Sequence, residues 1–184
     1  MSLHGNQTNK IVKFSFLLIS CLFFRLLPFR APNIEPITAA IMPLSGAYGK
    51  FVGIIFAILS VVLFDFLTGT LGVQTFFTAG AFGVLGLWSA SYFKKRKGTT
   101  MNYVRFAIVG TLFFDVVTGL TVGPIFFHQS FFASFVGQIP FTALHLLGNI
   151  VFAAILAPGI YNFLIKKKTK KSPIPIHILN PKTI

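Results

Sequence analysis

Two acidic residues recur in matching positions of an otherwise apolar sequence. Asp65 lies in the run FDFLTG, and Asp115 lies fifty residues later in the run FDVVTG. An ionised carboxylate is costly at membrane depth, so each side chain should face a cavity, a partner or the surface. One interpretation makes both acids hydrogen-bond acceptors for a polar ligand. The other makes each a residue at the end of a helix that bonds the turn formed by the following Thr-Gly pair.

A second group of polar residues surrounds two prolines in the segment RAPNIEP. It contains Arg30, Asn33 and Glu35, and the prolines stiffen the loop and bias the residue before each one toward extended geometry. These charged and amide groups are able to bind a ligand carboxylate, amide or phosphate. The alternative is a surface role, in which Arg25 extends its charged group to water and Glu35 pairs with Arg30.

Two histidines and an amide form the third group. His145 and Asn149 are four residues apart and therefore share one helix face, and His128 lies in the preceding loop. They are able to donate to a ligand, while an interhelical hydrogen bond for His145 fits its position equally well. Two histidines without a carboxylate motif are weak grounds for a metal site, so the sequence predicts neither a metal nor another cofactor.

Motifs of known enzyme classes are missing from the sequence. It contains no Walker A, HExxH or GxSxG pattern, and only three acidic residues are available for proton or phosphate chemistry. We therefore expect a protein that is not an enzyme. If it transports uphill, the energy must come from an ion gradient or from a separate ATPase.

Composition indicates whether these residues belong to a water-soluble protein or to a membrane protein. Hydrophobic residues make up 54% of the 184 residues and charged residues only 10%, whereas soluble domains carry about 25% charged residues. A water-soluble fold has no place to bury so much apolar surface. The sequence thus predicts an all-α integral membrane protein of about six transmembrane helices.

Six apolar segments are visible along the chain. Residues 1–9 are expected to form an N-terminal cytoplasmic segment, 10–168 the membrane domain, and 169–184 a flexible cytoplasmic tail. The segments run approximately over residues 11–28, 34–48, 51–67, 73–93, 103–122 and 136–165.

The basic residues predict the orientation. The net charge is +13, and the two main basic clusters directly follow apolar segments, which is typical of the cytoplasmic side of a membrane protein rather than of a nucleic-acid binder. With both termini in the cytoplasm, all three acids fall at external helix ends. The inner side then receives Lys10, Lys13, Lys50, Lys94–Lys97, Arg105 and the C-terminal lysines.

Small residues recur at helical spacing in the third and fourth segments. Such faces let helices approach closely, either for internal packing, which we favour, or for docking to another membrane subunit. They comprise Gly49, Gly53, Ala57, Ala79, Gly83, Gly86 and Ala90.

Over roughly residues 10–168 the chain resembles the S components of energy-coupling factor transporters, which are the substrate-binding membrane subunits of vitamin importers. The similarity rests on size, six helices, both termini inside, a basic inner face and the run PNIEPIT at residues 32–38. A Gly-spaced third helix that ends in Asp65, followed by Gly69 and the run GVQT with Gln74, adds to it. Cobalamin-type members look similar through this stretch, but the sequence does not identify the ligand.

The resemblance implies high-affinity binding of a small water-soluble nutrient near the external side of the cell inner (cytoplasmic) membrane. It also implies two kinds of partner, a transmembrane coupling subunit and two ATPase subunits. One difference is that the first helix lacks the Ala-xxx-Ala docking face of many members. Two alternatives remain, a self-sufficient ion-coupled carrier or channel and a membrane scaffold or enzyme without a recognisable motif. For the repeated acids, we expect Asp65 to be the stronger ligand contact because it lies nearer in sequence to the Arg30–Glu35 loop.

Overall fold

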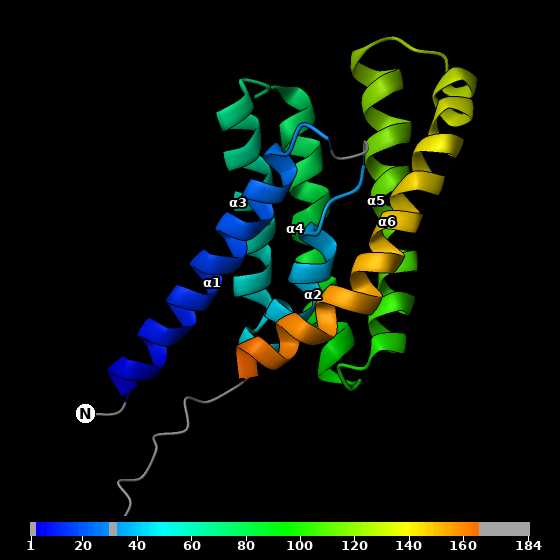
Figure 1. The fold of residues 1–184 in the computed structure, drawn as a ribbon. Coiled ribbons are helices and arrows are strands. Elements are labelled where there is room, and N and C mark those ends of the chain that lie inside the picture. Colours follow the sequence, from blue (N-terminus) through cyan, green and yellow to red (C-terminus); the bar gives the residue numbers. More distant parts are fainter. Residues whose placement is uncertain (1–2, 30–32, 166–184) are drawn as a thin grey trace, which may run out of the picture.

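The computed structural model describes residues 3–29 and 33–165. This part of the chain is all-helical and contains six helices (Figure 1). Their bounds are α1 Leu3–Leu26, α2 Ile37–Tyr48, α3 Lys50–Thr68, α4 Val73–Lys94, α5 Thr100–Phe126 and α6 Phe131–Ile165. The first helix already begins at Leu3, so residues 3–9 continue it instead of forming a separate segment. The predicted C-terminal tail, 169–184, lies outside the described residues.

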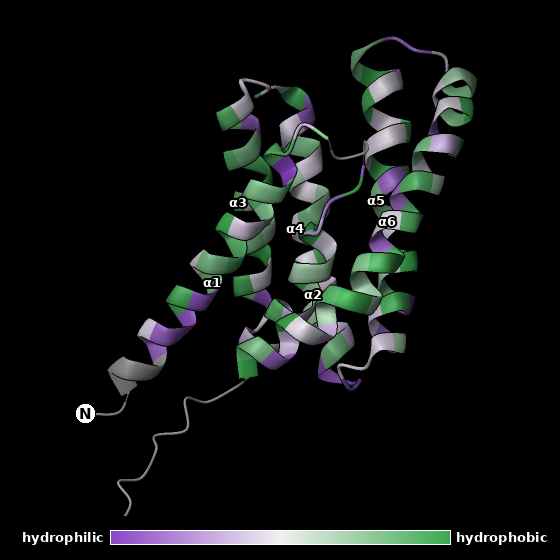
Figure 2. Cartoon of the chain, viewed as in Figure 1, coloured by the Kyte–Doolittle hydropathy of each residue, from purple (hydrophilic) through white to green (hydrophobic). Residues whose placement is uncertain are grey.

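Four helices, α3 to α6, are long and apolar enough to cross a membrane. Hydrophobic residues dominate these helices, while hydrophilic residues gather in the turns and at the start of α1 (Figure 2). This is the architecture of a helical membrane protein. The remaining two helices differ from the four: α1 carries Lys10, Lys13 and Arg25, and α2 has only 12 residues.

Helix α2 forms the centre of the bundle. All of its residues from Ile37 to Ser45 are buried, including Pro43, which the helix accommodates without ending. At 1.5 Å per residue, α2 is about 18 Å long, well short of the ~30 Å hydrocarbon core of a bilayer. Residues 33–36, which precede α2, run down into the bundle to reach it (Figure 1). Polar residues of this loop are therefore carried inside the helical bundle.

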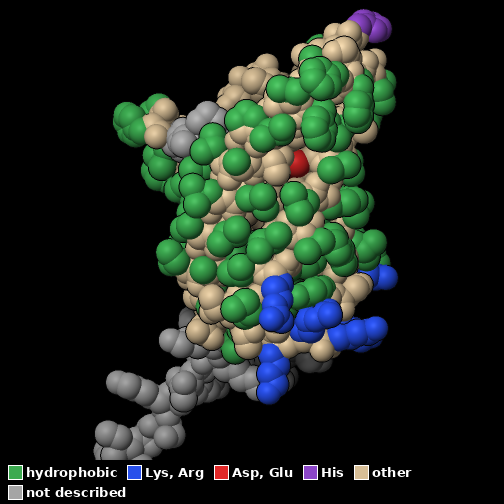
Figure 3. All heavy atoms as spheres, turned by 90° about the vertical axis from the view of Figure 1, so that its right-hand side faces the viewer, with side chains coloured by type: hydrophobic (Ala, Val, Ile, Leu, Met, Phe, Trp, Pro, Cys, Tyr) green, Lys and Arg blue, Asp and Glu red, His purple; other side chains and the backbone are tan. Residues whose placement is uncertain are grey.

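The two repeated motifs lie in two helical hairpins. The α3–α4 and α5–α6 turns lie at the same end of the molecule, as the repeat predicted (Figure 1). The opposite end carries the α4–α5 turn with its basic cluster, and Lys and Arg side chains gather there below an apolar flank (Figure 3). The second motif, however, does not end a helix, because α5 continues past Asp115 to Phe126.

Close packing of α3 against α4 uses the small residues of both helices. A Cβ added at Gly86 would lie 2.7 Å from the carbonyl carbon of Gly53 and 2.9 Å from the amide nitrogen of Ile54. Because Gly86 has no side chain, the two backbones approach to a distance that other residues would prevent. These two glycines therefore serve internal packing, the role favoured from the sequence, and are not available for docking a partner.

Candidate ligand-binding site

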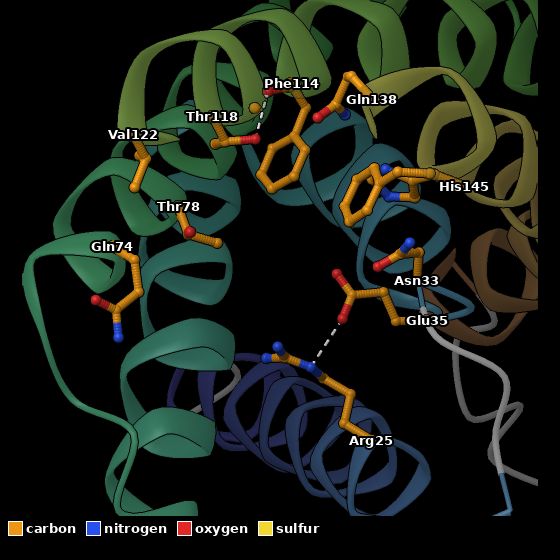
Figure 4. A pocket seen from close by; sticks show the side chains of 12 residues that line it. Arg25, Asn33, Glu35, Gln74, Thr78, Phe114, Thr118, Val122, Gln138 and His145 are labelled. Carbon is orange, nitrogen blue, oxygen red and sulfur yellow. Dashed lines mark hydrogen bonds and ion pairs between the residues drawn. The ribbon is translucent and has the colours of Figure 1, made fainter. Parts of the chain in front are cut away.

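A cavity of about 480 Å³ lies between the loop after α1 and helices α1, α4, α5 and α6, in the half of the bundle away from the basic end (Figure 4). It combines charged, amide and hydroxyl groups with aromatic walls. Its lining consists of Arg25, Asn33, Glu35, Gln74, Thr78, Phe114, Thr118, Gly119, Val122, Gln138, Phe141 and His145. Four residues predicted from the sequence, Asn33, Glu35, Gln74 and His145, thus lie around one cavity.

An ion pair forms the floor of this cavity in the view of Figure 4. The Nε of Arg25 lies 2.9 Å from Oε2 of Glu35, and the two side chains are only 8% and 12% exposed. Arg25 also donates to the Ser60 carbonyl at 2.7 Å, and its guanidinium stacks 3.8 Å from the centre of the Phe64 ring. The surface alternative considered from the sequence placed Arg25 at the water surface and paired Glu35 with Arg30. The structure instead buries Arg25 and pairs it with Glu35, while Arg30 lies outside the described residues.

A second buried pair joins α5 to α6. His145 Nδ1 and Asp115 Oδ1 are 2.7 Å apart, and both residues are almost fully buried. This contact fixes the orientation of the His145 ring. The remaining polar atoms, His145 Nε2 and Asp115 Oδ2, are buried without a hydrogen-bond partner among the described residues. Because His145 lines the cavity, its ring connects the cavity to Asp115.

One turn beyond His145, Asn149 continues the polar contact between the two helices. Its Nδ2 donates to Thr111 Oγ1 at 2.8 Å, and both residues are buried. Asn149 does not line the cavity. The interhelical hydrogen bond considered for His145 is its contact with Asp115, and the bond between Asn149 and Thr111 adds to the α5–α6 contact beneath the site.

The first of the repeated acids occupies a different environment. Asp65 Oδ2 accepts a 2.6 Å hydrogen bond from Thr75 Oγ1, and the same hydroxyl accepts from the Gly72 backbone at 3.1 Å. Gly69 ends α3 in the left-handed region, with φ of 69°. Asp65 therefore holds the α3–α4 turn and lies outside the cavity lining. This geometry favours Asp115, through His145, over Asp65 as the acid connected to a ligand, the reverse of the expected asymmetry.

The last predicted residue, His128, is exposed in the α5–α6 turn and does not reach the cavity. Within the described part of the chain it is one of two non-glycine residues with positive φ, at 52°, and the other is Asn33. Among residues 3–29 and 33–165, no three His, Cys, Asp or Glu side chains come together as metal ligands would.

Residues 5–173 match a sequence family described as "Family of unknown function (DUF6580)". The chain belongs to this family. No curated protein and no solved structure matches the chain. The function of this DUF6580 member must therefore be argued from its own geometry.

Several cavity residues of the DUF6580 protein escaped the sequence reasoning. Helical spacing offered a signal for some of them, since Gln138 and Phe141 precede His145 by seven and four residues and Thr78 follows Gln74 by four. Together the lining supplies an ion pair, amides that both donate and accept, and the walls formed by Phe114 and Phe141. Such a surface suits a small polar ligand with a planar part.

Proposed function

We propose that this DUF6580 protein binds a small water-soluble molecule in the cavity and takes part in its import across the cell inner (cytoplasmic) membrane. One observation carries the proposal. Polar side chains from five separate segments converge on a cavity of about 480 Å³ inside an apolar helical bundle. Ligand pockets typically measure about 300–1,000 Å³, and buried polar groups without a binding role are costly in lipid.

The proposed topology has six membrane segments with both termini in the cytoplasm. Basic residues concentrate at the end that carries the α4–α5 turn, which supports placing that end inside. In this arrangement α2 and the loop before it form the second segment together. The cavity then lies in the outer half of the membrane and receives its ligand from outside.

Cysteine labelling tests this orientation. In a background with Cys21 replaced, a cysteine at Thr70 or Gln129, in the two hairpin turns, should react with an impermeant thiol reagent applied outside intact cells. A cysteine at Gly98, in the basic turn, should react only after permeabilisation. The opposite pattern would reverse the orientation and place the cavity on the inner side.

Size and charge narrow the ligand class. Arg25 and Glu35 offset each other's charge within the lining, and the amides of Asn33, Gln74 and Gln138 offer both donors and acceptors. The volume suits a drug-sized compound and is small for a cobalamin-type cofactor. We infer a vitamin-sized ligand that is neutral or zwitterionic.

Energy for import is proposed to come from a transmembrane coupling subunit and two ATPase subunits, as in the S components that the sequence resembles. The chain itself offers no nucleotide-binding motif. The alternative is a self-sufficient carrier driven by an ion gradient. Purified protein in liposomes with an imposed ion gradient distinguishes the two. Accumulation by the chain alone would favour the carrier, whereas accumulation only with the partner subunits present supports the importer.

Two threonines on α5 provide a matched test of the binding site. Thr118 donates to the Phe114 carbonyl and Thr121 donates to the Val117 carbonyl of the same helix, but only Thr118 lines the cavity. The ligand is first identified by mass spectrometry of compounds that copurify with gently solubilised protein, and its affinity is then measured by calorimetry. Replacing Thr118 by Val removes a hydroxyl worth about 0.5–1.5 kcal/mol, or about two- to tenfold in affinity. Thr121→Val should leave affinity unchanged, and equal effects of the two variants would argue against this site.

A further inference from the structure

A second hollow, far from the proposed ligand cavity, lies where α2 turns into α3 at the basic end of the molecule. It has a volume of about 430 Å³. The α2–α3 corner contributes one side of the hollow and the last turns of α4 contribute the other. Its lining consists of Ser45, Gly46, Gly49, Lys50, Ala90, Ser91 and Lys94.

Hydrogen-bond donors at the α2–α3 corner lack a side-chain acceptor in the described part of the chain. Gly49 precedes α3 and has no side chain to accept from the N–H groups of the first turn. Those groups carry the positive end of the helix dipole, an arrangement that favours anions. Independently, Ser45 lines the hollow and is 2% exposed, and its buried hydroxyl has no hydrogen-bond partner among the described residues. A buried hydroxyl left without a partner costs free energy that a bound acceptor would recover.

Positive charge in the hollow has no acidic side chain to meet it. Lys50 and Lys94 line the hollow and are exposed. The whole chain contains only three acidic side chains, and all of them are engaged elsewhere. Glu35 pairs with Arg25, Asp65 accepts from Thr75, and Asp115 bonds His145. The counter-charge must therefore come from another molecule.

The surroundings of the hollow indicate the source of that anion. Phe51 follows Lys50 and is 70% exposed, and Leu87 lies one turn before Ser91 on α4 and is 43% exposed. The hollow thus lies where exposed apolar residues adjoin the lysines of the basic end, which is the level of lipid headgroups. We propose that this hollow binds the phosphate group of an anionic phospholipid, whose acyl chains lie along the flanking apolar residues. The α3 N-terminus, the Ser45 hydroxyl and the two lysines together form the phosphate site.

Native mass spectrometry of the full chain tests this site. The protein is released from nanodiscs of phosphatidylcholine with a minor fraction of phosphatidylglycerol, and retained lipid is counted. Wild type should retain phosphatidylglycerol in preference to phosphatidylcholine. The double variant Lys50→Gln/Lys94→Gln should retain it about twenty-fivefold less, since each lysine near an anionic headgroup is worth roughly fivefold. Ser45→Ala keeps the charge and should also lower retention, because it removes the buried donor.

A matched pair of lysines separates a built site from general attraction to the basic end. Lys95 and Lys97 belong to the same cluster as Lys94 but do not line the hollow. The variant Lys95→Gln/Lys97→Gln should keep most of the phosphatidylglycerol, whereas an equal loss in both double variants would overturn the site. Saturable binding of inorganic phosphate, abolished by the same Lys50 and Lys94 changes and without any preference for phosphatidylglycerol, would overturn the lipid source. The test uses no transport ligand, so its result is independent of the proposed function.

Discussion

Replacing Gly86 by Ala tests the packing that holds the two hairpin arms of α3 and α4 together. The new Cβ would lie 2.7 Å from the Gly53 carbonyl carbon, whereas carbon atoms in contact are normally about 3.5–4.0 Å apart. The helices must therefore separate locally by roughly 1 Å. Backbone atoms form the obstacle, so no side-chain rotation relieves it. Overpacking of this kind costs about 1–3 kcal/mol, which exceeds the gain of up to about 1 kcal/mol from replacing Gly in a helix.

Gly80 provides the control on the same helix. A Cβ at Gly80 meets nothing within 4 Å, so Gly80→Ala should be neutral or slightly stabilising. Thermal unfolding of both variants in the same detergent, with tryptophan fluorescence from Trp88 as the signal, measures the difference. For a chain of this length about 2 kcal/mol corresponds to roughly 4–8 °C. Equal melting temperatures for the two variants would refute the close approach of α3 and α4.

Two further sets of substitutions test the contacts of the three acidic residues. Arg25→Met leaves Glu35 without its partner and should destabilise the protein by about 3 kcal/mol, the low end for a broken buried pair because the pair lines a cavity. Glu35→Gln should cost less because Arg25 keeps its hydrogen bond to the Ser60 carbonyl, and the double variant should recover part of the loss. Chemical denaturation of all three variants measures these differences in stability. Asp115→Asn should weaken ligand binding through the misplaced His145 ring by about tenfold, whereas Asp65→Asn should lower the melting temperature and leave calorimetric affinity near wild type. The reverse pattern for the two acids would restore the original expectation that Asp65 contacts the ligand.

Local sequence patterns predicted the helices well where apolar segments are uninterrupted. The boundaries of α3 and α4 lie within about one residue of the apolar segments. The predicted end of α5, at residue 122, was too early, because Asp115 and Gly119 resemble the helix-ending residues of the first motif copy, whereas α5 ends at Phe126. Asp115 lies inside α5, where one of its carboxylate oxygens bonds His145, thirty residues away. The same six-residue pattern thus ends one helix and continues in another, depending on a distant partner.

The site was partly predictable for the same reason. Polar residues in an apolar sequence are conspicuous, and Asn33, Glu35, Gln74 and His145 were identified in this way. Arg25 was missed because a basic residue near a helix end normally reaches water. Arg25 instead pairs with Glu35, ten residues further along the chain. Apolar and hydroxyl cavity residues such as Phe141 and Thr78 look like ordinary membrane-helix residues until the cavity itself is known.

Filling the cavity with a larger side chain tests most directly whether the protein binds a small molecule there. Val122 on α5 lines the cavity. Val109 on the same helix is 50% exposed and does not line the cavity. Equal amounts of folded wild type, Val122→Trp and Val109→Trp are purified gently, and the small molecules that each releases on denaturation are quantified by mass spectrometry. The cavity account predicts one compound released in near-stoichiometric amount from wild type and Val109→Trp, and little from Val122→Trp. Release of that compound in equal amounts from all three proteins, or from none, would contradict it.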